Sequence, residues 1–241
     1  MSENTEKEEI KYQIVDRKFF VSREDIGEQG VLSIVNSVKD KIFGKRFSLF
    51  SSKDVRIIPK EIDRKYKLLI KISGTYTVDY FRKAYYYVFV DRNVQEVVIN
   101  DRPIKVEAVS EEKDMYQVRI EALERVVKSS SDYMIIDAHG RELKKNAIPN
   151  VNYMEITDAV IRQYDDYEKP ATHIPEHVRK LIGKLKNILP KRYEKINNEN
   201  VMIAEYFYYI PVYYVTLLKA PEGSTKMIEI NGITGEVREI K

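Results

Sequence analysis

The sequence predicts an α+β fold of antiparallel β-sheet units with flanking amphipathic helices. Short runs of aromatic and β-branched residues, separated by Gly, Pro, Asn and Asp, fill residues 55–109 and again 205–241. Several short strands in succession are typical of an antiparallel sheet. Two other stretches, 29–43 and 178–189, instead space their apolar residues by three and four, which is the period of an amphipathic helix.

The N-terminal part is expected to form one α+β domain over residues 10–160, after a solvated, disordered tail at 1–9. A strand is predicted at 10–21 and a helix at 29–43 that Gly44 ends. Six short strands should follow, and the turn chemistry between them includes Ser73-Gly74. The stretch 116–124 fits either a strand or a helix, and 132–137 is one more apolar run. The six predicted strands are 55–58, 67–72, 76–78, 85–90, 94–99 and 104–109.

A polar, acidic stretch predicts a linker or exposed loop at residues 161–174. The C-terminal unit, 175–241, then opens with Pro175, because proline is favoured at the first position of a helix. Its apolar stripe runs from Val178 to Leu189, and Pro190 stops it. A Tyr-rich meander of three strands is expected to complete the unit.

An internal duplication is suggested by two similar segments. Tyr213-Tyr214-Val215 leads through a loop to Ile230-Asn231-Gly232, and Tyr86-Tyr87-Val88 leads through a turn to Ile99-Asn100-Asp101. Both read as a Tyr-rich strand, a turn and a second strand, so we expect two related hairpins.

Composition removes several classes of function. The chain of 241 residues has no Cys, which excludes disulfides and thiolate chemistry, and it has no apolar run long enough for a transmembrane helix. Its charged N-terminus is unlike a signal peptide, so a cytoplasmic location and no membrane partner are expected. Glutamine is scarce and Lys and Glu are plentiful, which favours a thermophile; the sources we consider are an archaeon or its virus or plasmid.

The C-terminal tyrosines are the predicted partner surface. Consecutive strand residues face opposite sides, so part of the run 206–214 must lie on the outer face of the sheet. Exposed aromatic side chains are typical of a surface that binds a partner. The predicted contact residues are Tyr206, Tyr208, Tyr209, Tyr213 and Tyr214.

A basic helix face offers a second interpretation. No acid occurs between Val178 and Tyr193, and lysines on one side of a helix can neutralise phosphates of DNA or RNA. The plainer reading is a charged surface paired with acids of neighbouring elements. The predicted nucleic-acid contacts are Arg179, Lys180, Lys184, Lys186, Lys191 and Arg192.

Two patterns bear on metal chemistry. His173 and His177 are four residues apart, but Pro175 separates them, so two partly exposed histidines are expected rather than metal ligands.

Asp132, Asp137, Glu142 and Lys144 resemble the acidic residues and Glu-x-Lys of restriction-type nucleases, which implies Mg²⁺ on the carboxylates. Because Glu142 lies in a polar run, a solvated hairpin turn explains it better. No catalytic set, metal or cofactor is assigned.

The final segment resembles PepSY-type modules, in which a helix precedes a hairpin. The resemblance rests on a Tyr-rich strand followed by Ile-Asn-Gly-Ile-Thr-Gly-Glu-Val and covers about a quarter of the chain. It implies a helix-and-sheet unit that regulates or binds other proteins.

The leading hypothesis is a non-enzymatic interaction or adaptor protein that binds itself or a protein partner through Tyr-rich sheet faces. The alternatives are a nucleic-acid-binding protein that uses the basic helix 178–193, and a metal-dependent nuclease.

Overall fold

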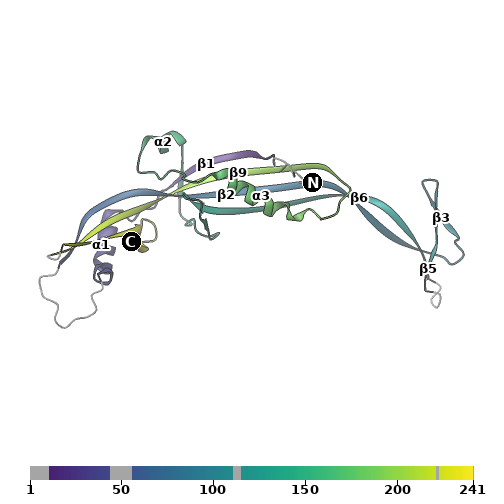
Figure 1. Ribbon diagram of the computed structural model, residues 1–241, viewed down its shortest axis with the longest axis horizontal. Coiled ribbons are helices and arrows are strands. Elements are labelled where there is room, and N and C mark those ends of the chain that lie inside the picture. The colour runs from purple at the N-terminus through teal and green to yellow at the C-terminus, as the bar shows by residue number, and fades with distance from the viewer. Residues whose placement is uncertain (1–10, 44–55, 111–114, 221–222, 241) are drawn as a thin grey trace, which may run out of the picture. The chain divides into compact units, whose positions relative to one another are not determined.

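A computed structural model describes residues 11–43, 56–110, 115–220 and 223–240 (Figure 1). The protein mixes α and β structure, and strands account for 58% of it against 18% for helices, so it is mostly β. The tail predicted at 1–9 and the helix stop predicted at Gly44 lie outside the described residues.

The described helices are α1 (Gly27–Ile42), α2 (Asp158–Gln163), α3 (Ile174–Leu185) and the short 3₁₀ helix η1 (Lys186–Ile188). The described strands are β1 (Gln13–Ser22), β2 (Arg56–Val90), β3 (Glu96–Ile99), β4 (Arg102–Lys105), β5 (Glu107–Ser110), β6 (Met115–Asp137), β7 (Glu142–Leu143), β8 (Tyr153–Ile156), β9 (Lys195–Ala220), β10 (Ser224–Asn231) and β11 (Val237–Ile240).

Nine of the described strands form one sheet, whose main path runs β11-β10-β9-β2-β6-β5. Most neighbours are antiparallel, as predicted. By contrast, β1 pairs in parallel with β9 so that Phe19 lies opposite Phe207 and Phe20 opposite Tyr208. The sheet is therefore mixed, because a strand from the start of the chain runs in the same direction as one from the end.

The chain divides into two compact units. Among the described residues, unit 1 contains those from 11–74, 132–181 and 202–240, and unit 2 contains those from 75–131 and 182–201. The linker predicted at 161–174 lies inside unit 1. Each unit is assembled from separate stretches, because the long strands β2, β6 and β9 each supply residues to both.

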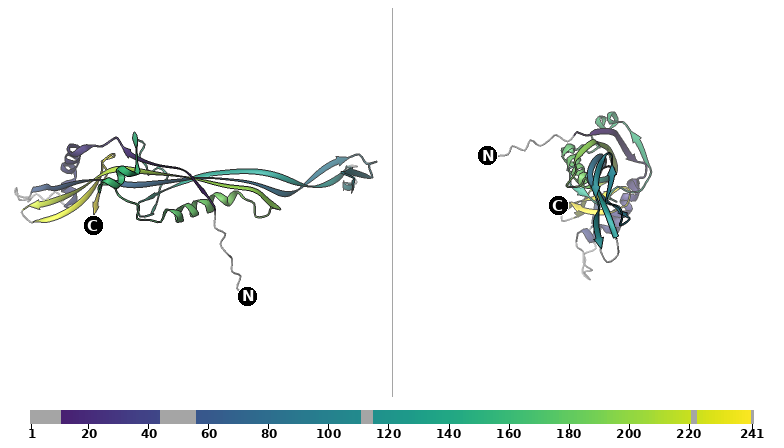
Figure 2. Two further views of the ribbon diagram at one scale, coloured as in Figure 1. Left: turned by 90° about the horizontal axis from the view of Figure 1, so that it is seen from above. Right: turned by 90° about the vertical axis from the view of Figure 1, so that its right-hand side faces the viewer.

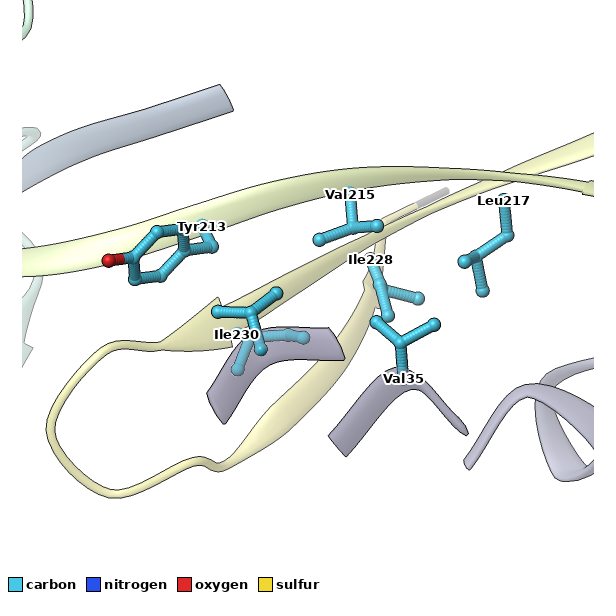
Figure 3. Packing of buried hydrophobic residues seen from close by; sticks show 7 residues of the cluster. Val35, Tyr213, Val215, Leu217, Ile228 and Ile230 are labelled. Carbon is cyan, nitrogen blue, oxygen red and sulfur yellow. The ribbon is translucent and has the colours of Figure 1, made fainter. Parts of the chain in front are cut away.

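The core of unit 1 includes one face of the C-terminal strands with α1 packed on it (Figure 3). Val31 and Val35 of α1 meet a set of buried β9 and β10 side chains, which are Tyr213, Val215, Leu217, Ile228 and Ile230. The helix predicted at 29–43 is confirmed as α1. Asp25 supports its start, because its Oδ1 accepts a hydrogen bond from the Gly27 backbone N–H at 3.0 Å.

The short strands predicted between residues 55 and 90 are instead one strand, β2, of 35 residues. The turn predicted at Ser73-Gly74 was wrong, since both residues continue this strand. Neighbouring strands lie on both sides of β2, and Ile72 and Tyr76 on either side of Gly74 are fully buried. Pairing and burial thus outweigh the weak preference of Ser-Gly for a turn.

The predicted duplication is not reproduced by strand pairing. β9 and β10 do form a hairpin, with Tyr213 opposite Ile230. The corresponding earlier strand does not fold back on β2, because β3 pairs with β4 in a separate two-stranded sheet. Asn100 and Asp101 make the connecting turn at positive φ angles of 49° and 61°, which these residue types tolerate.

The helix and the strands predicted after residue 174 are present, although their residues are divided between the two units. α3 begins at Ile174, and its apolar residues Val178, Leu181, Ile182 and Leu185 are buried. It ends five residues before Pro190, with η1 filling part of the interval. β9, β10 and β11 form the predicted three-stranded meander. No helix of the described residues combines the length and apolar character that a membrane crossing requires.

Candidate functional site

The C-terminal tyrosines chosen from the sequence do not form an exposed stripe. Tyr209 and Tyr213 are buried, and Tyr206, Tyr208 and Tyr214 are half-buried. Tyr213 belongs to the α1 core, and its hydroxyl donates a hydrogen bond of 2.8 Å to Asp25. Burial, helped by this carboxylate, raises the pKa of Tyr213 to about 12, so the hydroxyl stays protonated at neutral pH.

The residues that cover the C-terminal tyrosines come from distant parts of the chain. Phe20 of β1 stacks on Tyr208 with ring centroids 5.2 Å apart, and Tyr153 of β8 meets the same ring edge-on at 5.1 Å. The loop residue Tyr167 meets Tyr209 edge-on at 5.1 Å. The outer face expected from strand alternation is thus largely occupied by the protein itself.

The basic residues chosen as nucleic-acid contacts are mostly exposed, but acids neutralise part of their charge. Within unit 1, Lys180 lies 2.5 Å from a Glu142 carboxylate oxygen. Within unit 2, Lys186 lies 2.5 Å from Glu199 and is half-buried. These ion pairs reduce the charge that the nucleic-acid alternative requires. The remaining residues of the set, Arg179, Lys184, Lys191 and Arg192, are exposed.

The acids of the nuclease alternative do not converge on one point. Asp132 pairs with Lys145, Glu142 pairs with Lys180, and Asp137 lies 2.6 Å from Arg141. Glu142 belongs to β7, which folds back on the end of β6 as a short hairpin. In the part of the chain that the structure describes, no three acids or histidines are grouped to hold a metal ion.

The two histidines of the metal reading have separate partners. The Nε2 atom of His177 lies 3.1 Å from the Thr172 hydroxyl, whereas Nδ1 of His173 lies 3.8 Å from Glu176.

The exposed aromatic side chains lie instead on β2, in unit 2. Five consecutive residues are exposed, with fractions of 49% for Tyr85, 49% for Tyr86, 55% for Tyr87, 46% for Val88 and 63% for Phe89. Side chains alternate between the two faces of a strand, so an exposed run of five means that both faces are open. On β6, Leu123 and Val127 are also exposed, at 63% and 64%. We call residues 85–89, Leu123 and Val127 the aromatic ribbon.

The two strands of this ribbon run without a covering layer. Figures 1 and 2 show the part of β2 and β6 that leads to β3 and β5 as a twisted two-stranded ribbon, and no described helix lies along it. Open apolar faces of this kind are unusual in a soluble chain, because burying them against another surface is favourable.

Charged side chains next to the aromatic ribbon form ion pairs with each other. Arg82 lies 2.7 Å from Glu124 and Lys83 3.4 Å from Glu121. Hydrogen bonds from the Tyr86 hydroxyl and from Arg82 lower the pKa of Glu124, so that it is charged at neutral pH. Because these neighbouring charges pair with each other, the surface that the aromatic ribbon offers to a partner is mainly aromatic and apolar.

One further contact orients a ring of the ribbon. The guanidinium carbon of Arg119 lies 5.1 Å from the centroid of the Tyr85 ring, a cation–π geometry. Arg119 and Tyr85 therefore share one face, and Tyr86 with Glu124 lies on the other. This separates the ribbon into a face with Tyr85, Tyr87 and Phe89 and a face with Tyr86 and Val88.

Comparisons with known proteins add no assignment, since no family model, curated protein or solved structure matches this chain. The PepSY-type resemblance therefore stays a prediction.

Proposed function

We propose that this chain is an interaction protein that associates with a second copy of itself through the aromatic ribbon. The observation that carries the proposal is the run of five exposed apolar residues on a strand with both faces open. The contact face is the one that presents Tyr85, Tyr87 and Phe89. It replaces the buried C-terminal tyrosines as the Tyr-rich sheet face of the original hypothesis.

The exposed area is large enough to matter. A fully exposed aromatic residue offers about 200 Å². At the exposed fractions of Tyr85, Tyr87 and Phe89, the three rings supply about 330 Å² per copy. A standard protein interface uses about 800 Å² per partner, so these rings fill roughly two-fifths of one. Leu123 and Val127 extend the apolar part, and neighbouring charged side chains supply a polar rim.

The charge pattern supports a second copy as the partner. Residues 75–131 contain nine basic and ten acidic residues, so this part of unit 2 carries a net charge of −1 and two copies repel little. Lys83 and Glu121 lie on neighbouring strands of the same ribbon as an ion pair. Because this pair is neutral within one copy, it adds little repulsion when a twofold axis places the surface against itself.

Sedimentation velocity over a concentration series tests the proposal. The expected result is a reversible monomer–dimer equilibrium that persists at high salt, because apolar contacts are not screened. The Tyr85→Ser/Phe89→Ser double variant should stay monomeric while its circular dichroism spectrum matches the wild type. A wild-type chain that is monomeric at every concentration would reject the proposal.

A further inference from the structure

Unit 1 contains a cleft of about 640 Å³ whose floor is apolar. Leu69 of β2 and Ile210 and Val212 of β9 form this floor, and each is less than a tenth exposed. The volume falls within the range of small-molecule sites. Charged and amide side chains from two turns, residues 137–149 and 229–238, line the rest.

The cleft lies on the face of the C-terminal strands that α1 leaves open. Tyr213 and Val215 point to α1 on one side (Figure 3), and alternation puts Val212 on the other. Asn231 is opposite Val212 in the β9–β10 register, and Glu229 is two residues before it, so both stand on the cleft side. The sheet thus has a closed face and an open one.

Two carboxylates of the cleft, Glu229 and Asp137, accept hydrogen bonds from neighbouring groups of the protein. Both oxygens of Glu229 accept from Nζ of Lys67, at 2.9 and 3.2 Å. Asp137 Oδ1 accepts from the backbone N–H groups of His139 and Arg141, at 3.0 and 2.9 Å. Asp137 Oδ2 accepts from Nε of Arg141 at 2.6 Å. These two acids therefore help to hold the walls of the cleft together.

The cleft also presents donors with hydrogen-bonding capacity left. A guanidinium carries five N–H groups, and within the described residues the Arg141 side chain uses its Nε, although it is 75% exposed. Arg238 holds Glu236 only loosely, at 3.3 and 3.2 Å. Asn231 accepts through Oδ1 from two backbone N–H groups, so the donor of this side chain is its amide N–H₂.

We infer that this cleft binds a monocarboxylate with an apolar body. Arg141, anchored by Asp137, and Arg238 would take the carboxylate, since a guanidinium matches its two oxygens. The apolar body would lie on Leu69, Ile210 and Val212. Four acids and three bases line the cleft, a net charge of −1, which disfavours a phosphate dianion and leaves a single negative charge to be held directly by the two guanidinium groups. This site is in unit 1 and does not depend on the aromatic ribbon.

Isothermal titration of the full chain with octanoate tests the inference, with octylammonium and inorganic phosphate as matched probes. Octanoate should bind, and the other two should not. Arg141→Gln and, separately, Arg238→Gln should each weaken octanoate binding by about tenfold, because each removes charge-assisted hydrogen bonds. Arg23→Gln, which changes an exposed arginine outside the cleft, should leave binding unchanged.

A second readout locates the ligand. In methyl NMR spectra, octanoate should shift the signals of Leu69 and Val212 and leave Val35, on the α1 side, unmoved. The Arg238→Gln variant keeps the test valid if Arg141→Gln unfolds, because Arg238 does not anchor the buried Asp137. Equal binding of octylammonium, or octanoate binding unaffected by Arg238→Gln, would overturn the inference.

Discussion

Replacing Tyr87 by serine should weaken self-association about 100-fold. At 55% exposure, this residue offers about 110 Å² per copy, taking about 200 Å² for a fully exposed aromatic residue. A twofold dimer contains the residue twice, and burying half of each exposed surface removes about 110 Å² from water in total. At about 25 cal/mol per Å², the substitution costs about 3 kcal/mol, or roughly a hundredfold in Kd.

The assay is sedimentation equilibrium, with Tyr164→Ser as the matched control. Tyr164 is the same residue type, is 50% exposed and belongs to unit 1, so this variant should dimerise like the wild type. Thermal unfolding of both variants should match the wild type, because neither ring is part of a core. Equal dimer Kd values for Tyr87→Ser and Tyr164→Ser would refute the reasoning, since area on the ribbon would then carry no special weight.

Two predictions concern the fold of unit 1. Burial acts to raise the pKa of Asp137, but hydrogen bonds from Arg141 and the turn backbone outweigh it and hold this pKa below its usual range. Since the folded pKa is the lower one, Asp137→Asn should cost about 1.5–3 kcal/mol at neutral pH in urea unfolding. That cost should shrink as pH falls below about 4 and through the folded pKa, whereas exposed Asp165→Asn should show no such trend. A difference in unfolding free energy between Asp137→Asn and the wild type that does not change with pH would contradict this prediction. Ile228→Ala should cost about 2–5 kcal/mol in the same assay because Ile228 is fully buried against α1, and its neighbour Met227→Ala, on the exposed face, should cost far less. Similar costs for the two would contradict the placement of the core.

The sequence alone was sufficient where the signal is local. The apolar spacing of α1 needs only the helix period, and Val31 and Val35 are the residues that it buries. The turn at Asn100-Asp101 needs only two residues that tolerate positive φ. The stripe on α3 was predicted for the same reason as α1. In each case the pattern that predicts the conformation involves only residues that are close together in the sequence.

The choice of surface depended on contacts between distant residues. Both Tyr-rich runs have the same local character, and the C-terminal run was the one predicted to be the partner surface. Tyr208 is covered because Phe20 of β1, far away in sequence, pairs beside it in parallel. No such strand covers Tyr87, because β3 pairs with β4 instead of folding back on β2. Alternation shows which side chains share a face of a strand, but it does not show whether another segment covers that face.

The charges of the predicted sites show the same limit. Lys180 and Glu142 are 38 residues apart in sequence and Lys186 and Glu199 are 13 apart, yet each pair meets at 2.5 Å. The sequence pattern by itself therefore predicted β-rich segments and amphipathic helices, and the composition predicted many charged side chains. Which charges pair, which tyrosines stay exposed and which sheet face opens as a cleft were decided only by tertiary structure, because each depends on segments that meet only when the chain has folded.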